Sequence, residues 1–498
     1  MDAALPEAMG RDEWLNKLGF VFDPFEYEAA DELAEGDPYL HEYFVEFPYF
    51  DELKKPRSCI LFTQRGGGKS ANRLRLAEWC EDSFRRPAGG EAYLAVHYVD
   101  FLTVLADITL ARHIEAILRQ AVPALLDALF QHMPGALKGL SPQGKEDLSW
   151  FVQKYSDRLI PAGLREELKA VGSSTPKITP DKVTPVADHT IKAVGSIFKR
   201  APVEAVQEAV QGLIELFRWE FKETEAGNWL RTEPLEIARR FVAVVKELGI
   251  SGVFVLVDRV DEFQGTAGRP ERQVELLRPL LANLPLLGIF AFKCFLPLEL
   301  LPELRRRLGA DEFREDRILI REVRWETEDI KRILEHRLAA GSQRRHSSFN
   351  SLVAGIKPEE SIDDRLVEFA YHSPRDLIQL CERIFSEHTR LPTTKLLIEG
   401  GEIDSALSWF SRTRARRLYQ DDHLARLIRI RQLPFSVPLV CQSLNRSEEE
   451  VRDLLNTWEK IGLIRQVAAK DDLPTYDVPD PRARLVWEEE HIDEPTST

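Results

Sequence analysis

The feature that most constrains the fold is a glycine-rich loop between a short apolar run and a helical pattern. The apolar run covers 59–62, and apolar residues recur at helical spacing from 70 to 81. The loop follows the Walker A pattern GxxxxGK[ST], except that a threonine takes the place of the first glycine. Strand, glycine loop and helix in this order predict the phosphate-binding unit of an α/β fold with a parallel sheet. The loop reads Thr63-Gln64-Arg65-Gly66-Gly67-Gly68-Lys69-Ser70.

The residue types in this loop suit a polyphosphate. Glycines have no Cβ, so the backbone N–H groups can turn inward around a phosphate. Lys69 reaches the β- and γ-oxygens, the Ser70 hydroxyl binds Mg²⁺, and the following helix adds the positive end of its dipole. The alternative is a chance GK[ST] in a surface turn. We expect residues 63–71, Ala71 included, to bind ATP with Mg²⁺.

An acidic segment downstream supplies the partner of this loop. The apolar run 253–257 ends in Asp258-Arg259-Val260-Asp261-Glu262. A carboxylate directly after a buried strand is the Walker B arrangement, so we expect Asp258 to hold Mg²⁺ through water. We expect Glu262, with Asp261 second, to orient the attacking water. Because Arg259 stands where many such ATPases place a catalytic glutamate, the sequence predicts slow hydrolysis, which suits a switch better than a motor.

Further strands and helices complete the predicted core, residues 57–325. Strands alternating with helices predict an α/β core with a parallel sheet, and with the two motifs above this core resembles that of the P-loop NTPases of the AAA+/ASCE class. Residues 102–245 read as a helical insertion, interrupted by a Ser/Thr/Pro-rich loop at 173–188. The strand patterns lie at 59–62, 92–101, 252–257, 287–295 and 317–325.

Residues 419–487 predict a winged helix, followed by a tail at 488–498. Ser447 and Glu450 form a capping box before a helix with an i, i+3, i+4, i+7 apolar stripe. Arginines are concentrated at 412–431, and their positive charge favours binding to the phosphate backbone of DNA. Three glutamates at 448–450, at the start of the recognition helix, would repel that backbone. Duplex DNA bound through 412–478 and a protein partner therefore both stay open.

The order of these motifs resembles that of origin-recognition-type AAA+ ATPases, with a STAND-like DxxDE form at 258–262. The resemblance covers most of 20–490 and implies an all-α lid at 326–418, the C-terminal winged helix and a homo-oligomer. It also implies a sensor 2 arginine at Arg375, within the segment 372–377, and a sensor 1 residue near Lys293, where this family usually has a small polar side chain. The alternative for Arg375 and for Lys293 is a purely structural role, in a surface ion pair or in the core. The resemblance further implies adenine contacts from Phe22, Phe25, Tyr43 or Phe44 and an arginine finger at Arg314 or Arg317.

Composition and charge limit the partners and the cellular compartment that we expect for the protein. The net charge of −15 excludes a general polyanion binder, and residues 1–56 hold 15 acidic against 4 basic residues. This acidic, aromatic-rich segment predicts a packed prelude that flanks the nucleotide site. No apolar stretch reaches the roughly 20 residues of a membrane span, so we expect no membrane partner. The five cysteines show no paired spacing, which argues against a disulfide framework or zinc site and favours a cytoplasmic protein.

Three functions are compatible with this sequence. The one we favour is a nucleotide-dependent switch, an ATPase that assembles or changes shape on binding ATP and hydrolyses it slowly. The resemblance places such switches in bacterial phage defence or stress signalling. The alternative is an origin-recognition-like AAA+ ATPase that binds or remodels duplex DNA through its winged helix. A third is a non-catalytic scaffold that binds nucleotide tightly.

Overall fold

The protein is described by a computed structural model in which two compact units are distinguished. One unit comprises residues 46–65 and 69–323, and the other comprises residues 1–45, 66–68 and 324–498. The Ser/Thr/Pro-rich loop predicted at 173–188 lies outside the described residues. The structure describes residues 9–30, 37–47, 49–85, 90–133, 135–157, 160, 163–166, 168, 203–217, 233–357, 359–390, 393–470 and 473–492.

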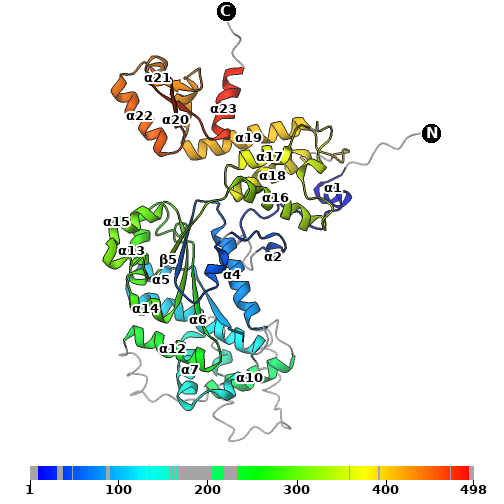
Figure 1. Cartoon of the computed structure of the whole chain (residues 1–498). Helices are drawn as coiled ribbons and strands as arrows, with labels where there is room; N and C mark the ends of the chain where they lie inside the picture. Colours follow the sequence, from blue (N-terminus) through cyan, green and yellow to red (C-terminus); the bar gives the residue numbers. More distant parts are fainter. Residues whose placement is uncertain are drawn as a thin grey trace, which may run out of the picture. The chain divides into compact units, whose positions relative to one another are not determined.

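A five-stranded parallel sheet forms the centre of the 46–323 unit (Figure 1). Its order is β2-β3-β4-β1-β5, so one strand separates the P-loop strand β1 from the acidic strand β3. This order is that of the additional-strand P-loop NTPases, and the predicted α/β fold class is confirmed. The strands are β1 Cys59–Thr63, β2 Tyr93–Tyr98, β3 Gly252–Val257, β4 Ala291–Pro297 and β5 Leu319–Val323.

The strand predicted at 287–295 is partly wrong. Its first residues belong to a short helix, α14 (Leu284–Ile289), and β4 begins only at Ala291. The Asn283 side chain accepts a hydrogen bond from the Leu286 N–H at 3.0 Å, and Pro285 occupies the first turn. A capping asparagine followed by proline is a helix-start signal, and it outweighs the apolar run here.

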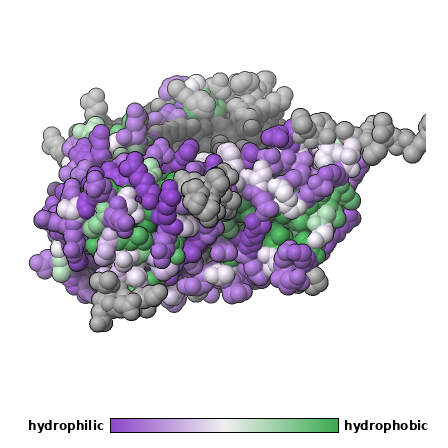
Figure 2. All heavy atoms as spheres, turned by 90° about the horizontal axis from the view of Figure 1, so that it is seen from above, coloured by the Kyte–Doolittle hydropathy of each residue, from purple (hydrophilic) through white to green (hydrophobic). Residues whose placement is uncertain are grey.

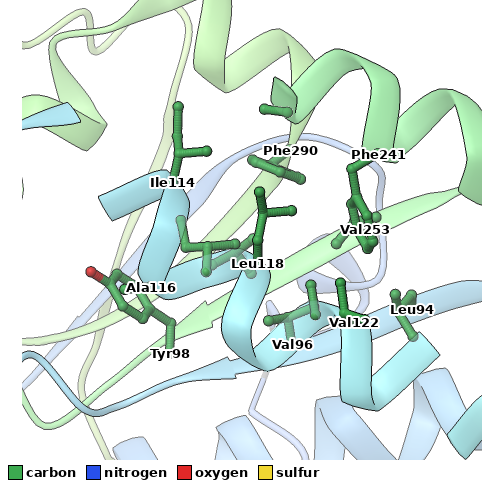
Figure 3. Packing of buried hydrophobic residues seen from close by; sticks show 14 of the residues in the cluster. Leu94, Val96, Tyr98, Ile114, Ala116, Leu118, Val122, Phe241, Val253 and Phe290 are labelled. Carbon is green, nitrogen blue, oxygen red and sulfur yellow. The ribbon is translucent and has the colours of Figure 1, made fainter. Parts of the chain in front are cut away.

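Helices cover this sheet and share one core with it. Figure 3 shows Ile114, Leu118 and Val122 of α6 packed over Leu94 and Val96 of β2. Phe241 of α12 joins the same cluster because α12 presents a stripe of apolar residues to the sheet. The helices are α4 Lys69–Ser83, α5 Leu102–Leu105, α6 Leu110–His132, α7 Pro142–Tyr155, α10 Val203–Phe217, α12 Pro234–Glu247, α13 Pro270–Leu281 and α15 Leu300–Glu312, with α3 Phe50–Leu53 before β1.

The predicted insertion at 102–245 is mostly helical where it is described. Its apolar residues, such as Leu148 of α7 and Leu213 of α10, belong to the same buried cluster as the strands. The described helices of this segment are therefore layers of the sheet's own core rather than a separate body.

In the second unit, residues 9–30 and 37–45 pack against the helices that follow residue 324. Trp14 of α1 (Arg11–Leu18) is fully buried, and its ring lies 5.0 Å from that of Phe385. The Val21 N–H donates to the carbonyl of Gly341 at 2.7 Å. The acidic prelude is thus an integral layer of this helical part. Its helices are α2 Leu40–Tyr43, α16 Thr327–Gly341, α17 Ile362–Ala370, α18 Pro374–His388 and α19 Gly400–Tyr419.

The C-terminal part of this unit contains a small antiparallel sheet of order β6-β8-β7 and four helices. Ser447 caps α22 as the sequence predicts, because its side chain and that of Glu450 each bind the other's backbone N–H. The buried centre includes Leu427, Val451 and Trp458. Its elements are α20 Asp421–Ile428, β6 Phe435–Ser436, α21 Val437–Leu444, α22 Glu448–Lys460, β7 Arg465–Lys470, β8 Leu473–Asp477 and α23 Pro481–Ile492.

One face of the molecule is drawn with its side chains in Figure 2. Hydrophilic side chains predominate on the face drawn in Figure 2, with hydrophobic ones interspersed among them. Within the described residues, no helix is both long enough and apolar enough to cross a membrane.

Trp458 offers a test of the C-terminal core. Its side chain is fully buried, and its Nε1–H donates to His423 Nδ1 at 3.0 Å. Trp458→Ala should cost about 3–5 kcal/mol of unfolding free energy because it leaves a large cavity. Trp409→Ala is the matched control, since this tryptophan is 49 % exposed, and it should cost under about 1 kcal/mol. Chemical unfolding followed by circular dichroism measures both, and equal losses would contradict this account of the core.

Candidate functional site

The glycine loop begins where β1 ends and stops where α4 begins. Thr63 is the last residue of β1 and is fully buried, and Lys69 is the first residue of α4. Gly66 and Gly68 have φ values of +80° and +85°, which L-residues with a Cβ rarely adopt. The glycines at these two positions are therefore required by the backbone. Gln64 and Arg65 are exposed, and Ala71 is partly buried in the first turn of α4.

The acidic segment lies beside the start of α4. Parallel strands place their carboxyl ends at one edge of a sheet, so the ends of β1 and β3 bring Ser70 and Asp258 together. The Ser70 hydroxyl donates to Asp258 Oδ2 at 3.0 Å, and the Asp258 carboxylate is 1 % exposed. Its other oxygen, Oδ1, accepts the backbone N–H of Arg259 at 2.8 Å.

Lys69 forms an ion pair with the second aspartate. Its Nζ lies 3.0 Å from Asp261 Oδ2, and the two side chains are 10 % and 3 % exposed. Asp261 Oδ1 is buried and has no hydrogen-bond partner among the described residues. Glu262 follows in the same turn and is exposed. Of the two predicted catalytic carboxylates, Asp261 therefore faces the P-loop lysine.

These side chains suit a hard divalent cation. Mg²⁺ takes oxygen ligands, and it commonly binds one or two carboxylates together with substrate phosphates. Here the Ser70 hydroxyl and the Asp258 carboxylate stand side by side. Asp261 Oδ1 is a buried oxygen without a hydrogen-bond partner among the described residues, so it is a further oxygen donor beside Lys69. The donor set fits the Mg²⁺ site that the motifs predict.

Arg73 is a member of this cluster that the sequence analysis missed. It lies one helical turn after Ser70 on α4, and its Nε donates to Asp258 Oδ2 at 3.0 Å. Its Nη1 lies 2.8 Å from Nδ1 of His97, on β2. The only signal in the sequence is the i, i+3 spacing from Ser70, which does not show whether an arginine points inward or toward solvent.

Gly66 contacts the segment that carries Arg375, within the unit to which both belong. The Arg375 N–H donates to the Gly66 carbonyl at 3.3 Å. A Cβ on Gly66 would lie 2.9 Å from Ser373 Oγ and 3.0 Å from Arg375 Cβ. The structure thus holds the predicted sensor 2 segment against the loop through its backbone.

Trp325 is a second residue that the sequence analysis missed. Its Nε1–H donates to the Gly67 carbonyl at 3.0 Å, and the indole is 5 % exposed. His372 Nδ1 lies 2.8 Å from the Trp325 carbonyl oxygen. A buried tryptophan N–H needs an acceptor, but the sequence does not say which one it finds.

The assignment of Lys293 as a sensor is wrong. Lys293 pairs in register with Cys59 at the amino end of the sheet, whereas Pro297 pairs with Thr63. Lys293 therefore lies four strand residues, about 13 Å, from the end of the sheet at which the glycine loop begins. The Lys293 ammonium donates to the carbonyls of Lys55 and Arg57 at 2.6 and 2.7 Å, and burial lowers its pKa to about 8. Its role is to satisfy the backbone before β1.

Three of the four aromatic residues suggested for an adenine pocket, Phe22, Phe25 and Tyr43, contact neighbouring side chains. Phe25 is fully buried against Phe385, at 5.2 Å between ring centroids. Tyr43 is also buried, with the Arg337 guanidinium 4.1 Å from its ring centroid. Phe22 stacks on Tyr39. We assign Phe25 and Tyr43 to the core, because core contacts already occupy their rings.

The two arginines suggested as fingers share one acidic partner. Arg314 binds Asp316 with two hydrogen bonds of 2.8 Å, and Arg317 lies 3.4 Å from the same carboxylate. Nothing in these contacts distinguishes either from an ordinary surface arginine.

Comparison with known proteins identifies no family. No protein-family model matches the chain, and no curated protein matches it. A Walker-type ATPase of Pyrococcus abyssi is 13 % identical with a TM-score of 0.40, covering 94 % of this chain and 100 % of its own. The Aeropyrum pernix ORC1 protein in complex with DNA is 12 % identical with a TM-score of 0.33, covering 99 % and 95 %. The Aeropyrum pernix ORC2 protein is 11 % identical with a TM-score of 0.33, covering 92 % and 98 %. These values are too low to assign a family.

Lys293→Met tests the corrected role of this lysine. It should lower the free energy of unfolding by about 1–3 kcal/mol, since two backbone carbonyls lose their donor. The affinity for ATP–Mg²⁺ should stay within about twofold of wild type, because the ammonium lies at the other edge of the sheet. Thermal unfolding and isothermal titration measure the two effects, with the exposed Lys246→Met as control. A tenfold loss of ATP affinity would restore the sensor assignment.

Proposed function

We propose that the protein is an ATP-binding, slowly hydrolysing P-loop ATPase that works as a nucleotide-dependent switch. One observation carries this proposal. Lys69, the residue that would bind the β- and γ-phosphates, forms an ion pair with Asp261 at 3.0 Å. ATP must draw Lys69 away from this carboxylate. Binding of the nucleotide therefore breaks the ion pair of Asp261 with Lys69, a change that the rest of the chain can register.

The residues take the following roles in this proposal. The N–H groups of the glycine loop cradle the phosphates, and Ser70 and Asp258 would hold Mg²⁺. That ion supplies positive charge to the phosphate oxygens. Asp261, once released by Lys69, and Glu262 orient the attacking water. Because Arg259 fills the position directly after Asp258, no carboxylate stands there, and we expect slow turnover.

The switch needs a route from the glycine loop to another part of the molecule. Asp376 follows Arg375 directly, and its carboxylate is almost fully buried. It accepts hydrogen bonds from Arg414 Nε at 2.9 Å and from Arg482 Nη1. Arg482 lies at the start of α23, in the C-terminal part. A shift of Arg375 at the Gly66 carbonyl therefore bears directly on a charge cluster that joins α18 to α19 and α23.

A second route ends at the same arginine. Trp325 joins Gly67 to His372, and the neighbouring Tyr371 lies under Arg482, with 5.3 Å between the guanidinium and the ring centroid. Arg482 is itself fixed by Asp480, which accepts two hydrogen bonds of 2.8 Å from its Nε and Nη2. Tyr419 donates to Asp480 at 2.7 Å. Both glycine contacts thus converge on Arg482, and we propose that this cluster passes the nucleotide state to the C-terminal part.

We interpret the C-terminal part, from 419 onward, as a winged helix that binds a protein rather than DNA. Several arginines of the basic segment are already paired with carboxylates. Arg412 lies 2.9 Å from Glu489, and Arg416 lies 3.5 Å from Asp421. The first turn of α22 carries Glu448, Glu449 and Glu450. Each such carboxylate opposes a phosphate backbone, which weighs against duplex DNA as the partner.

Lys69→Ala tests the switch. We expect wild type to bind ATP–Mg²⁺ and to assemble, seen as a rise in mass by light scattering. Lys69→Ala should bind ATP at least tenfold more weakly, about 1.4 kcal/mol, because a charge-assisted contact is lost. Thermal unfolding separates loss of binding from loss of fold, with Lys331→Ala as a surface control. Assembly that requires duplex DNA would favour the DNA-associated alternative, and wild type that binds no nucleotide would refute the proposal.

Asp376→Asn tests the relay. The amide keeps the shape of the carboxylate but weakens its hold on Arg414 and Arg482. ATP affinity should stay within about threefold of wild type, while the change in hydrogen exchange that ATP causes at 421–492 should be lost. Asp364→Asn removes an ion pair on the surface of the same unit, to Lys331 at 2.7 Å, and should keep the response. An unchanged response in Asp376→Asn would contradict the relay.

A further inference from the structure

Arg73 is an unusual neighbour for a metal-binding carboxylate. Its side chain is 6 % exposed, and its Nε donates to Asp258 Oδ2, the same oxygen that accepts the Ser70 hydroxyl at 3.0 Å. The guanidinium carries no acceptor, so His97 Nδ1, at 2.8 Å from Nη1, accepts its hydrogen bond and the imidazole is neutral. Arg73 thus forms an ion pair with Asp258 through Nε and a hydrogen bond with His97 through Nη1.

Four buried charged side chains at this edge of the sheet form two ion pairs. Lys69 pairs with Asp261 and Arg73 with Asp258, and all four side chains are at most 10 % exposed. Buried charges interact strongly because little water screens them. A divalent cation that approached this cluster alone would meet two carboxylates that are already neutralised and two fixed cations that repel it.

We propose that Arg73 is a positioning residue that acts through Asp258, holding this carboxylate against Ser70 and excluding Mg²⁺ until a nucleotide arrives. This inference rests on the proposed nucleotide site. The phosphates bring the negative charge that the metal needs, and they draw Lys69 from Asp261, so metal and nucleotide enter together. The cluster then binds Mg²⁺ together with ATP but does not bind free Mg²⁺. This suits a switch that must not respond to the ion alone.

Metal binding without nucleotide tests this role. Mn²⁺ is the probe, followed by its electron paramagnetic resonance signal, and the thermal shift caused by Mg²⁺ is a second readout. Wild type should bind Mn²⁺ only when ATP is present. Arg73→Gln should bind Mn²⁺ without ATP at least about tenfold more tightly than wild type, because a fixed positive charge next to Asp258 is gone. Arg73→Lys keeps the charge and should keep the exclusion.

Two further variants locate the effect. Arg85→Gln removes a surface arginine just after α4, paired with Asp82 at 2.9 Å, and should behave as wild type. Arg73→Gln/Asp258→Asn should lose the Mn²⁺ binding gained by the single variant, since the carboxylate that holds the metal is gone. Retained binding in the double variant would place the metal elsewhere and overturn the proposal.

The outcomes separate this inference from the proposed function. Wild type that binds Mn²⁺ as tightly without ATP as with it overturns the role of Arg73 while the ATPase proposal stands. This measurement needs no variant, so it decides the question even if Arg73→Gln does not fold. Failure of wild type to bind ATP would instead refute the nucleotide site itself.

Discussion

The structure depends on the buried pairing of two cations with two carboxylates at the carboxyl edge of the sheet. Lys69 and Arg73 come from one helix, and Asp258 and Asp261 come from the turn after β3. Burying any of these charges alone would be costly, whereas the four together are neutral. The pairing ties the strand β3 to the helix α4, which follows β1, across the intervening strand β4.

The glycine loop serves two demands at once. Its left-handed residues allow the turn that a phosphate needs, and its carbonyls accept hydrogen bonds from Arg375 and Trp325 within the second unit. Gly66 has no room for a Cβ against Ser373 and Arg375. The same missing side chain thus permits both phosphate approach and contact with the segment that leads to Asp376 and Arg482.

The buried polar network around Arg482 gives the C-terminal part a defined attachment. Asp376, Asp480, Arg414 and Arg482 are paired, although Asp376 Oδ1 keeps no partner among the described residues. Hydrogen bonds in such a buried network depend on one another, and an unpaired buried oxygen is costly, so a change at one member affects the others. This property makes the cluster suited to a relay, while the apolar centre around Trp458 gives the module its own stability.

The sequence by itself determined the P-loop, the acidic turn after β3, the parallel α/β core and the cap of α22, because these depend on local patterns and on spacing along the chain. Only the tertiary structure decided that Lys293 lies at the amino edge of the sheet, that Arg73 points inward to Asp258, and that Trp325 and Arg375 reach the glycine loop. A one-dimensional pattern places a residue on an element, but it does not give the strand register or the direction of a long side chain. Both follow from packing between segments that are far apart in sequence. That packing brings Lys69 and Arg73 next to Asp261 and Asp258, and so balances their charges.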